Sequence, residues 1–210
     1  NLYTLQAKAG KEYHIEILFK QRNERATLDF DLGKQVEINL NLAVEKVKDA
    51  DIVLFAGGIS PSLEGEEMPV EVPGFKGGDR TDIELPAVQR DLLKALKKAG
   101  KKVVFINYSG SAIGLVPESN TCEAILQAWY PGQAGGTAIV DVLFGDYNPA
   151  GRLPVTFYKN AGQLPDFEDY SMKGRTYRYM QQEPLFPFGH GLSYTDFTYG
   201  EAKLSKNTIA

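Results

Sequence analysis

The chain has 210 residues, of which 43% are hydrophobic and 24% charged, a balance that is typical of a globular protein and excludes a disordered chain. The net charge of −4 leaves no basic face for nucleic acid, and no apolar run is long enough to span a membrane. The single cysteine, Cys122, excludes an internal disulfide and a cysteine-rich metal site.

The first 40 residues show the two-residue alternation of β-strands. Apolar side chains alternate with polar ones over residues 13–19 and again over residues 28–32. Two or three strands cannot bury a core by themselves. We therefore expect this segment to be the tail of a β domain whose beginning lies outside this chain.

From residue 41 the pattern changes to alternating helices and strands. Helices are expected at residues 42–47, from Pro86 to Gly100 and at residues 135–144, and strands at residues 52–56, 103–107, 123–129 and 153–157. The strands are continuous apolar runs, which is typical of a parallel sheet with helices covering both faces. The sequence therefore predicts an α/β fold, a parallel-sheet sandwich with flavodoxin-like layering.

From residue 164 onward the chain is rich in Tyr, Phe, Pro and Gly and has no helical or strand period. It contains too many aromatic side chains for a disordered linker. We therefore expect a long ordered loop.

An acidic segment at residues 63–68 directly follows the first expected strand. It carries Glu64, Glu66 and Glu67 around Gly65. Open α/β sheets bind ligands at the carboxyl ends of their strands. Crowding of like charges raises the pKa of at least one carboxylate, as a general acid near neutral pH requires. By itself the pattern is equally compatible with a solvated acidic loop.

Asp79 and Arg80 are an adjacent acid and base ahead of the second expected helix. Ordering the long loop at residues 59–81 costs backbone entropy that only tertiary contacts offset. We therefore expect the side chains of Asp79 and Arg80 to pair with neighbours and to fix this loop.

Several other kinds of site are not indicated. The chain has neither the dinucleotide fingerprint nor a Walker-type loop, so no nucleotide cofactor is expected. His14 and His190 stand apart from any other ligand at metal-binding spacing, so no metal site is expected. Residues 109–111 lack the nucleophile elbow of serine hydrolases, and Cys122 is interpreted as a small buried hydrophobe.

A series of short motifs nevertheless occurs in a fixed order. They lie at residues 50–58, 64–66, 78–80, 129–132, 141–145, 148–157, 175–179 and 186–194. Together they resemble the C-terminal α/β domain of glycoside hydrolase family 3, the β-glucosidases and β-xylosidases. The resemblance covers residues 41–199.

The resemblance implies a retaining mechanism, which needs two carboxylates about 5 Å apart. In this family the nucleophilic Asp belongs to an N-terminal (β/α)₈ barrel, near a Ser-Asp-Trp sequence. The single tryptophan here, Trp129, follows Ala128. The resemblance therefore implies that the nucleophile lies in a barrel outside this chain, and that the loop at residues 59–80 supplies the acid/base.

Relatives carry Ser-Gly-Glu-Gly or Glu-Ala-Glu in this loop. Comparison with residues 64–67 selects Glu66 as the acid/base and leaves Glu64 and Glu67 as alternatives. Asp79 and Arg80 are assigned to the substrate loop in a structural role. No cofactor or metal is implied.

The flanks resemble other modules. Residues 1–40 resemble the end of a protective-antigen-like, carbohydrate-associated β domain, and residues 200–210 the start of a fibronectin type III-like domain. The resemblance also implies a periplasmic or secreted bacterial enzyme.

The leading hypothesis is thus the acid/base-contributing domain of a retaining β-glycosidase. Such an enzyme would hydrolyse β-linked oligosaccharides or aryl β-glycosides from the non-reducing end, as a β-glucosidase or β-xylosidase. The alternative is a non-catalytic carbohydrate-binding or scaffolding module, which the β segment and the aromatic residues also suit. A flavodoxin-like nucleotide domain rests on the layering alone.

Overall fold

The computed structural model describes residues 5–20, 33, 38–206 and 208. The chain divides into two compact units, Asn1–Ile38 and Asn39–Ala210, which are considered separately. Among the helices of the described residues, none has the length and apolar character needed to cross a membrane.

In the first unit, the predicted strand at residues 13–19 does not form. Residues 5–20 contain a turn at Gly10, whose φ is 76°, and the amide of Lys11 donates to the carbonyl of Lys8 at 3.2 Å. A strand needs a neighbouring strand to bond its backbone, and the described residues provide none. The second predicted run, at residues 28–32, lies outside the described residues.

The second unit is built on a parallel sheet, as predicted. Its strands are β1 (Ile52–Gly58), β5 (Lys102–Tyr108) and β6 (Ala124–Gln127), in the order β1-β5-β6. Strand β6 is shorter than the predicted residues 123–129, because Trp129 has a left-handed φ of 56° that ends the extended backbone.

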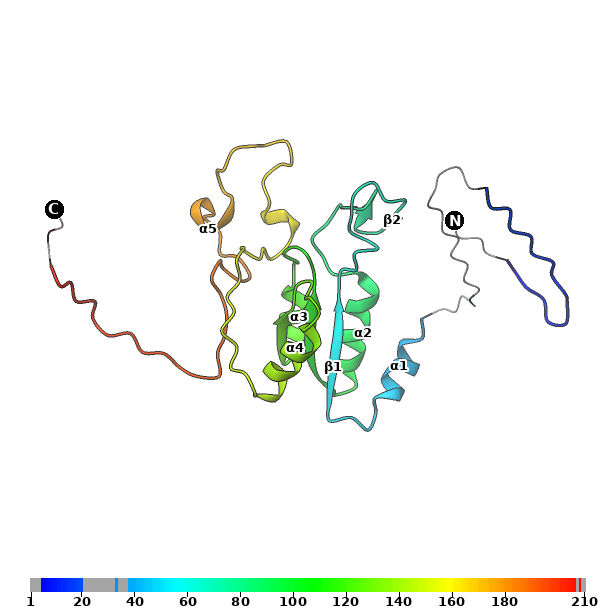
Figure 1. Cartoon of the computed structure of the whole chain (residues 1–210), viewed down its shortest axis with the longest axis horizontal. Helices are drawn as coiled ribbons and strands as arrows, with labels where there is room; N and C mark the ends of the chain where they lie inside the picture. The colour runs from blue at the N-terminus through cyan, green and yellow to red at the C-terminus, as the bar shows by residue number, and fades with distance from the viewer. Residues whose placement is uncertain (1–4, 21–32, 34–37, 207, 209–210) are drawn as a thin grey trace. The chain divides into compact units, whose positions relative to one another are not determined.

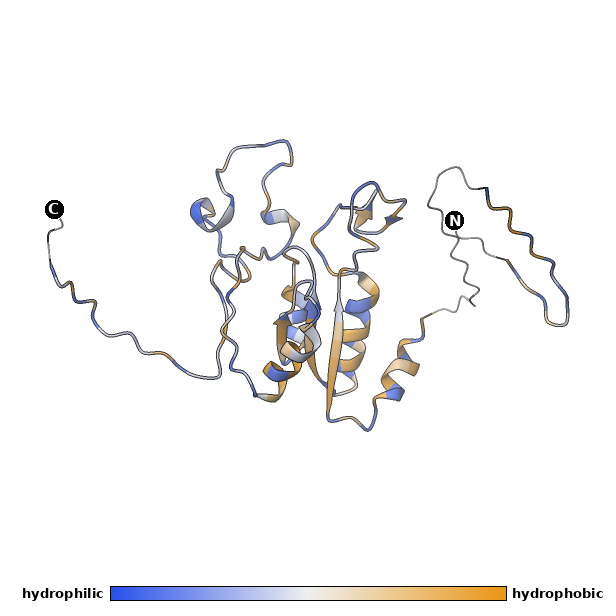
Figure 2. Ribbon diagram, viewed as in Figure 1, coloured by the Kyte–Doolittle hydropathy of each residue, from blue (hydrophilic) through white to orange (hydrophobic). Residues whose placement is uncertain are grey.

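Helix α2 (Ala87–Lys98) covers one face of this sheet. It packs on β5 and contacts both α1 (Leu40–Lys46) and α3 (Val116–Thr121), and it runs alongside β1 in Figure 1. Leu93 and Leu96 are buried against a sheet face that includes Phe105. In Figure 2, α2 shows both hydrophobic and hydrophilic residues, as expected of an amphipathic helix.

The opposite face of the sheet is only partly covered, which corrects the prediction of cover on both faces. In the central strand β5, Ile106 is buried on that face. In the edge strand β1, Ile52 and Leu54 are 54% and 50% exposed. These two apolar side chains are therefore about half exposed in this unit.

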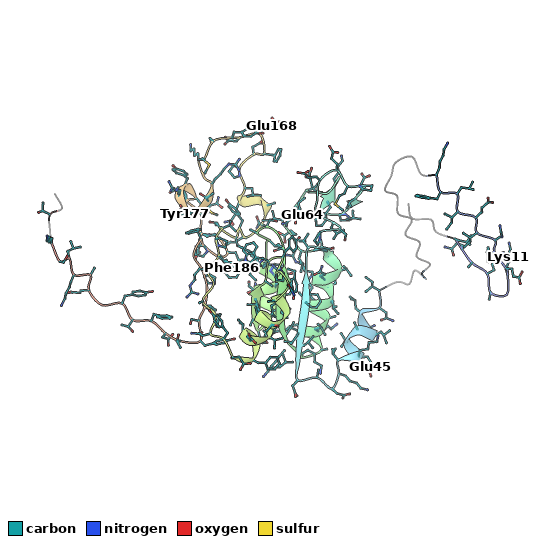
Figure 3. All side chains as sticks on the ribbon, viewed as in Figure 1. Lys11, Glu45, Glu64, Glu168, Tyr177 and Phe186 are labelled. Atoms are coloured by element: carbon teal, nitrogen blue, oxygen red, sulfur yellow. The ribbon has the colours of Figure 1, made fainter. Side chains whose placement is uncertain are left out.

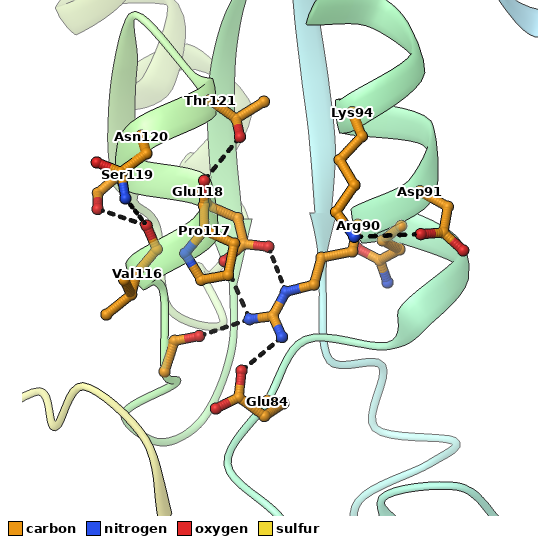
Figure 4. A network of polar contacts seen from close by, with 12 residues as sticks. Glu84, Arg90, Asp91, Lys94, Val116, Pro117, Glu118, Ser119, Asn120 and Thr121 are labelled. Carbon is orange, nitrogen blue, oxygen red and sulfur yellow. Dashed lines mark hydrogen bonds and ion pairs between the residues drawn. The ribbon is translucent and has the colours of Figure 1, made fainter.

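An ion-pair network joins α2 to the short helix α3, which the sequence did not predict (Figure 4). Glu118 on α3 accepts two hydrogen bonds from Arg90, one from Nε at 2.7 Å and one from Nη2 at 3.1 Å. Arg90 Nη1 also lies 2.5 Å from Glu84 Oε2. Burial lowers the pKa of Arg90, but its hydrogen bonds to Glu118 and Glu84 outweigh burial and raise the pKa overall.

Helix α4 (Gly135–Phe144) has the predicted bounds and ends at Gly145, whose φ of 86° suits glycine. The predicted strand at residues 153–157 is wrong, because only single bridges form there. Phe157 pairs with Phe186 as an isolated antiparallel bridge, and the amide of Leu153 donates to the carbonyl of His190 at 2.9 Å. Pro154 has no amide proton to continue a ladder between these bonds.

The remaining elements are short. A 3₁₀ turn (Ala161–Gln163) precedes a mostly irregular segment at residues 164–206, which α5 (Thr176–Tyr179) interrupts, in agreement with the predicted loop. We call residues 59–81, which follow β1, the acidic loop. Within it, three two-residue strands form a small antiparallel sheet: β2 (Glu71–Val72), β3 (Phe75–Lys76) and β4 (Asp79–Arg80).

Candidate functional site

The carboxyl ends of the three parallel strands carry the candidate site. Glu64 follows β1, Ser111 follows β5 and Tyr130 follows β6. Figure 3 places Glu64 just beyond the end of β1. Since the strands are parallel, these side chains gather at one edge of the sheet, which is the edge where open α/β sheets bind ligands.

The start of the acidic loop is anchored to both neighbouring elements. Gln89 on α2 accepts from the amide of Gly58 and donates to its carbonyl, each at 2.8 Å. The amide of Ile59 donates to the carbonyl of Tyr108 at 2.7 Å. Gly58 has a φ of 131°, and a Cβ there would lie 1.9 Å from the Tyr108 oxygen, so only glycine fits.

The far end of the loop returns to the acidic segment through its backbone. The amide of Gly65 donates to the carbonyl of Gly78, and the amide of Met68 to the carbonyl of Gly77, both at 3.0 Å. Phe75 on β3 is buried and joins the hydrophobic core. Ile59 belongs to the same core, and Leu63 and Val70 pack against it, so the loop is a folded hairpin held by hydrogen bonds and apolar contacts.

Among the three glutamates at residues 64–67, Glu64 is the one whose side chain forms a hydrogen bond in the described part of the chain. Its Oε1 accepts from Ser111 Oγ at 3.2 Å, and Arg80 Nη1 donates to the same Ser111 oxygen at 2.8 Å. Burial lowers the pKa of Arg80, and the charge of Glu64 is the largest of the opposing influences. Glu64 and Arg80 are therefore a partly buried pair of opposite charges, bridged by a hydroxyl.

Tyr130 closes the cluster on the side of β6. Its hydroxyl donates to the carbonyl of Ile59 at 2.9 Å, at the start of the acidic loop. Burial raises the pKa of Tyr130, and the charge of Glu64 is the second cause that raises it. Its ring lies so close to Gly110 that a Cβ there would be 2.8 Å from Cε2. The ring therefore needs glycine in the turn that carries Ser111.

Glu66 and Glu67 lie outside this cluster. Both are exposed, and Glu67 has a left-handed φ of 47°. Asp79 is exposed as well, whereas Arg80 is half-buried and also donates to the carbonyls of Asp82 at 3.1 Å and Ala112 at 3.2 Å. Of the predicted residues, Glu64 and Arg80 thus share one polar cluster, whereas Glu66, Glu67 and Asp79 are open to solvent on the same loop.

The other residues considered from the sequence have structural surroundings. His190 stacks on Phe186, with ring centroids 4.8 Å apart. Cys122 packs against the core, and burial raises the pKa of its thiol to about 11. Ser109 is buried and contacts Asn107 and Gln127. Among the described residues, no three His, Cys, Asp or Glu side chains gather closely enough to hold a metal ion.

Sequence reasoning did not select Ser111 or Tyr130. From the sequence, Ser111 is interpreted only as lacking the context of a serine nucleophile, and Tyr130 as an aromatic residue for packing or, if exposed, for stacking on a sugar ring. Their position directly after predicted strands was the available signal, because parallel strands end at one edge.

A second feature is an open hollow in the long C-terminal loop, about 510 Å³ in volume. Aromatic and sulfur-containing side chains line it, namely Phe167, Tyr170 and Met172, with Asp169 and Arg175 as its charged members. Phe167 and Tyr170 are 93% and 92% exposed. Apolar rings with this exposure are able to contact the faces of sugar rings.

The fold and the loop of carboxylates define a class, an α/β domain that presents acidic side chains at the carboxyl edge of a parallel sheet. A family model, the glycosyl hydrolase family 3 C-terminal domain, matches residues 3–194. The chain belongs to glycoside hydrolase family 3, as the motif series predicted.

Two curated relatives show how the match is distributed. A xylan 1,4-β-xylosidase of Xylanibacter ruminicola is 59% identical over 97% of this chain and 24% of its own length. A periplasmic β-glucosidase of Salmonella typhimurium is 40% identical over 80% of this chain and 22% of its own length. The chain thus spans about a quarter of the length of these relatives.

Solved structures of glycosidases share the fold of this chain. A β-D-glucoside glucohydrolase of Trichoderma reesei has a TM-score of 0.65 at 25% identity, covering 78% of this chain and 24% of that one. A family 3 exo-β-xylosidase in complex with a xylobiose aziridine activity-based probe has a TM-score of 0.61 at 30% identity, covering 75% of this chain and 20% of that one. The predicted α/β fold is confirmed.

Proposed function

We propose that this chain is the acid/base-contributing part of a retaining β-glycosidase, with β-linked xylosyl residues as its substrate. The observation that carries the proposal is the folded loop of carboxylates at the carboxyl edge of the sheet, in a chain that belongs to family 3. The 59% identity to a xylan 1,4-β-xylosidase favours xylose over glucose.

In this proposal Glu66 is the general acid. It is exposed on a loop whose two ends are held by backbone hydrogen bonds, so its carboxyl group can reach a substrate outside the chain. It would give its proton to the leaving oxygen as the glycosidic bond breaks, and then take a proton from the attacking water. The Asp nucleophile would come from a (β/α)₈ barrel of the same enzyme.

Glu64 has a different role in this proposal. Its Oε2 is buried without a hydrogen-bond partner in the described part of the chain, and its Oε1 is bound by Ser111. A carboxylate so enclosed beside Arg80 is suited to holding the loop rather than to reaching a leaving group. Glu67 stays an alternative acid, since it is exposed as well.

The test uses the complete enzyme that carries this chain and the barrel. Glu66→Gln should lower kcat/KM for xylosides with poor leaving groups by about 10²–10⁴-fold, the usual contribution of a general acid. Activated aryl xylosides need little protonation and should lose much less. Azide should restore turnover of Glu66→Ala, because a small anion attacks the glycosyl-enzyme without a base.

Glu67→Gln and Glu64→Gln are the matched controls, because they neutralise the other two carboxylates of the acidic segment at residues 63–68. They should show modest losses that do not depend on the leaving group. Leaving-group dependence and azide rescue at Glu64 or Glu67, but not at Glu66, would place the acid/base at that residue instead.

The second candidate function is a non-catalytic carbohydrate-binding module, which the open hollow around Phe167 and Tyr170 favours. In that case the isolated chain should bind xylo-oligosaccharides, and Phe167→Ala should abolish binding. Calorimetric titration with xylose and xylotetraose decides between the functions, because half of an active site should bind these sugars poorly.

A further inference from the structure

Three polar side chains, two from the acidic loop and one from the turn after β5, form a chain of hydrogen bonds. Arg80 Nη1 donates to Ser111 Oγ at 2.8 Å, and Ser111 Oγ donates to Glu64 Oε1 at 3.2 Å. Arg80 lies on β4, Ser111 in the turn after β5 and Glu64 in the loop after β1. We call this arrangement the Arg80–Ser111–Glu64 relay.

The chemistry of the three groups fixes the direction of the relay. A guanidinium only donates and a carboxylate only accepts, whereas a hydroxyl has one proton to donate and two lone pairs. Ser111 is therefore the member that accepts from the cation and donates to the anion. Alanine in its place would remove both bonds, and threonine would keep the hydroxyl that makes them.

The relay is the polar attachment of the Glu64 side chain in the described part of the chain. The second oxygen of Glu64, Oε2, and the Nη2 of Arg80 are buried and have no hydrogen-bond partner there. Arg80 is itself held by the carbonyls of Asp82 and Ala112. Loss of the Ser111 hydroxyl would therefore leave the Glu64 side chain without a hydrogen bond, while Arg80 would stay in place.

We propose that Ser111 is a positioning residue for the acid/base step, acting by holding Glu64 and the segment that carries Glu66 two residues further on. This inference rests on the proposed function. A general acid must lie within hydrogen-bond reach of the leaving oxygen, about 2.6–3.2 Å. A displacement of about 1 Å can reduce the rate about 100-fold, so the attachment of this loop is part of the catalytic machinery.

The experiment compares Ser111→Ala and Ser111→Thr in the complete enzyme. For a xyloside with a poor leaving group, Ser111→Ala should lower kcat/KM by about 10-fold, the value of one charge-assisted hydrogen bond. For a 2,4-dinitrophenyl xyloside it should lower kcat/KM by less than about 2-fold, because protonation contributes little there. Ser111→Thr should restore most of the loss. Ser119→Ala is the matched control, since its hydroxyl bonds within α3, to the carbonyl of Val116.

A double variant tests whether Ser111 acts through the acid. In a Glu66→Gln background, Ser111→Ala should cause no further loss that depends on the leaving group. The inference would be overturned if Ser111→Ala lowered kcat/KM equally for both substrates, or if Ser119→Ala caused the same loss. The proposed function would survive that result as long as Glu66→Gln still showed its dependence on the leaving group. If Glu64→Gln rather than Glu66→Gln shows the dependence, the acid is Glu64 and the relay holds it directly; the assignment of Glu66 then fails and the role of Ser111 stands.

Discussion

Replacing Glu118 by alanine is expected to destabilise the second unit strongly. Glu118 is 1% exposed and Arg90 is 16% exposed, so the pair is largely removed from water. The substitution deletes the bonds from Arg90 Nε and Nη2 to the carboxylate. Among the described residues, Glu84 and the carbonyl of Gly114 are then the partners that remain for the guanidinium.

The magnitude follows from the cost of a buried charge that has lost its partner. Breaking a buried ion pair from one side costs about 3–5 kcal/mol. The lower end applies here because Glu84 still faces Arg90 at 2.5 Å, so we expect about 3 kcal/mol. For a chain of this size that corresponds to a fall in Tm of roughly 6–12 °C.

Urea unfolding followed by circular dichroism measures this cost. Glu123→Ala is the control, because its ion pair with Lys97 is exposed, at 51% and 48%, and should contribute less than about 1 kcal/mol. The double variant Arg90→Met with Glu118→Met should recover most of the loss, since it removes both charges. A cost of Glu118→Ala equal to that of Glu123→Ala would refute the reasoning.

Two further predictions concern Cys122 and the glycines of the acidic loop. Because burial raises the pKa of the Cys122 thiol from 9.0 to about 11, its thiolate fraction at pH 8 is about 100-fold lower than that of a free thiol, and iodoacetamide should react about 100-fold more slowly. The rate should rise with pH up to about 11, and a fast reaction at pH 8 in the folded state would contradict this. Gly78→Ala should lower Tm much more than Gly74→Ala: both glycines have positive φ, but a Cβ at Gly78 would lie 2.0 Å from the Gly65 oxygen and one at Gly74 meets nothing within 4 Å. Similar Tm values for the two variants would show that the contact with Gly65 relaxes freely.

The sequence predicted the α/β class and the elements with a strong local signal. Helix α4 has its predicted bounds because Gly145 stops it with a left-handed φ. Helix α2 begins next to Pro86 because proline fits where a missing amide proton costs no hydrogen bond. Strands β1 and β5 were predicted because each is a continuous apolar run, which is typical of strands in a buried parallel sheet.

Elements that depend on distant partners were missed. Helix α3 is six residues long, too short for its own propensity to indicate it, and is joined to α2 by the pair of Glu118 and Arg90. The strand predicted at residues 153–157 does not form, because Pro154 has no amide proton and interrupts the hydrogen bonds to the partner segment.

The candidate site, too, was predicted from the sequence only in part. The sequence by itself determined that three carboxylates follow the first strand and that Arg80 lies near the end of the same loop, because residue types and spacing are local properties. Only the tertiary structure decided that Ser111 joins Arg80 to Glu64 while Glu66 stays exposed. The physical reason is that the two partners of Ser111 are 31 and 47 residues away along the chain, and hydrogen bonds of about 3 Å between such residues are set by the parallel strands that end side by side.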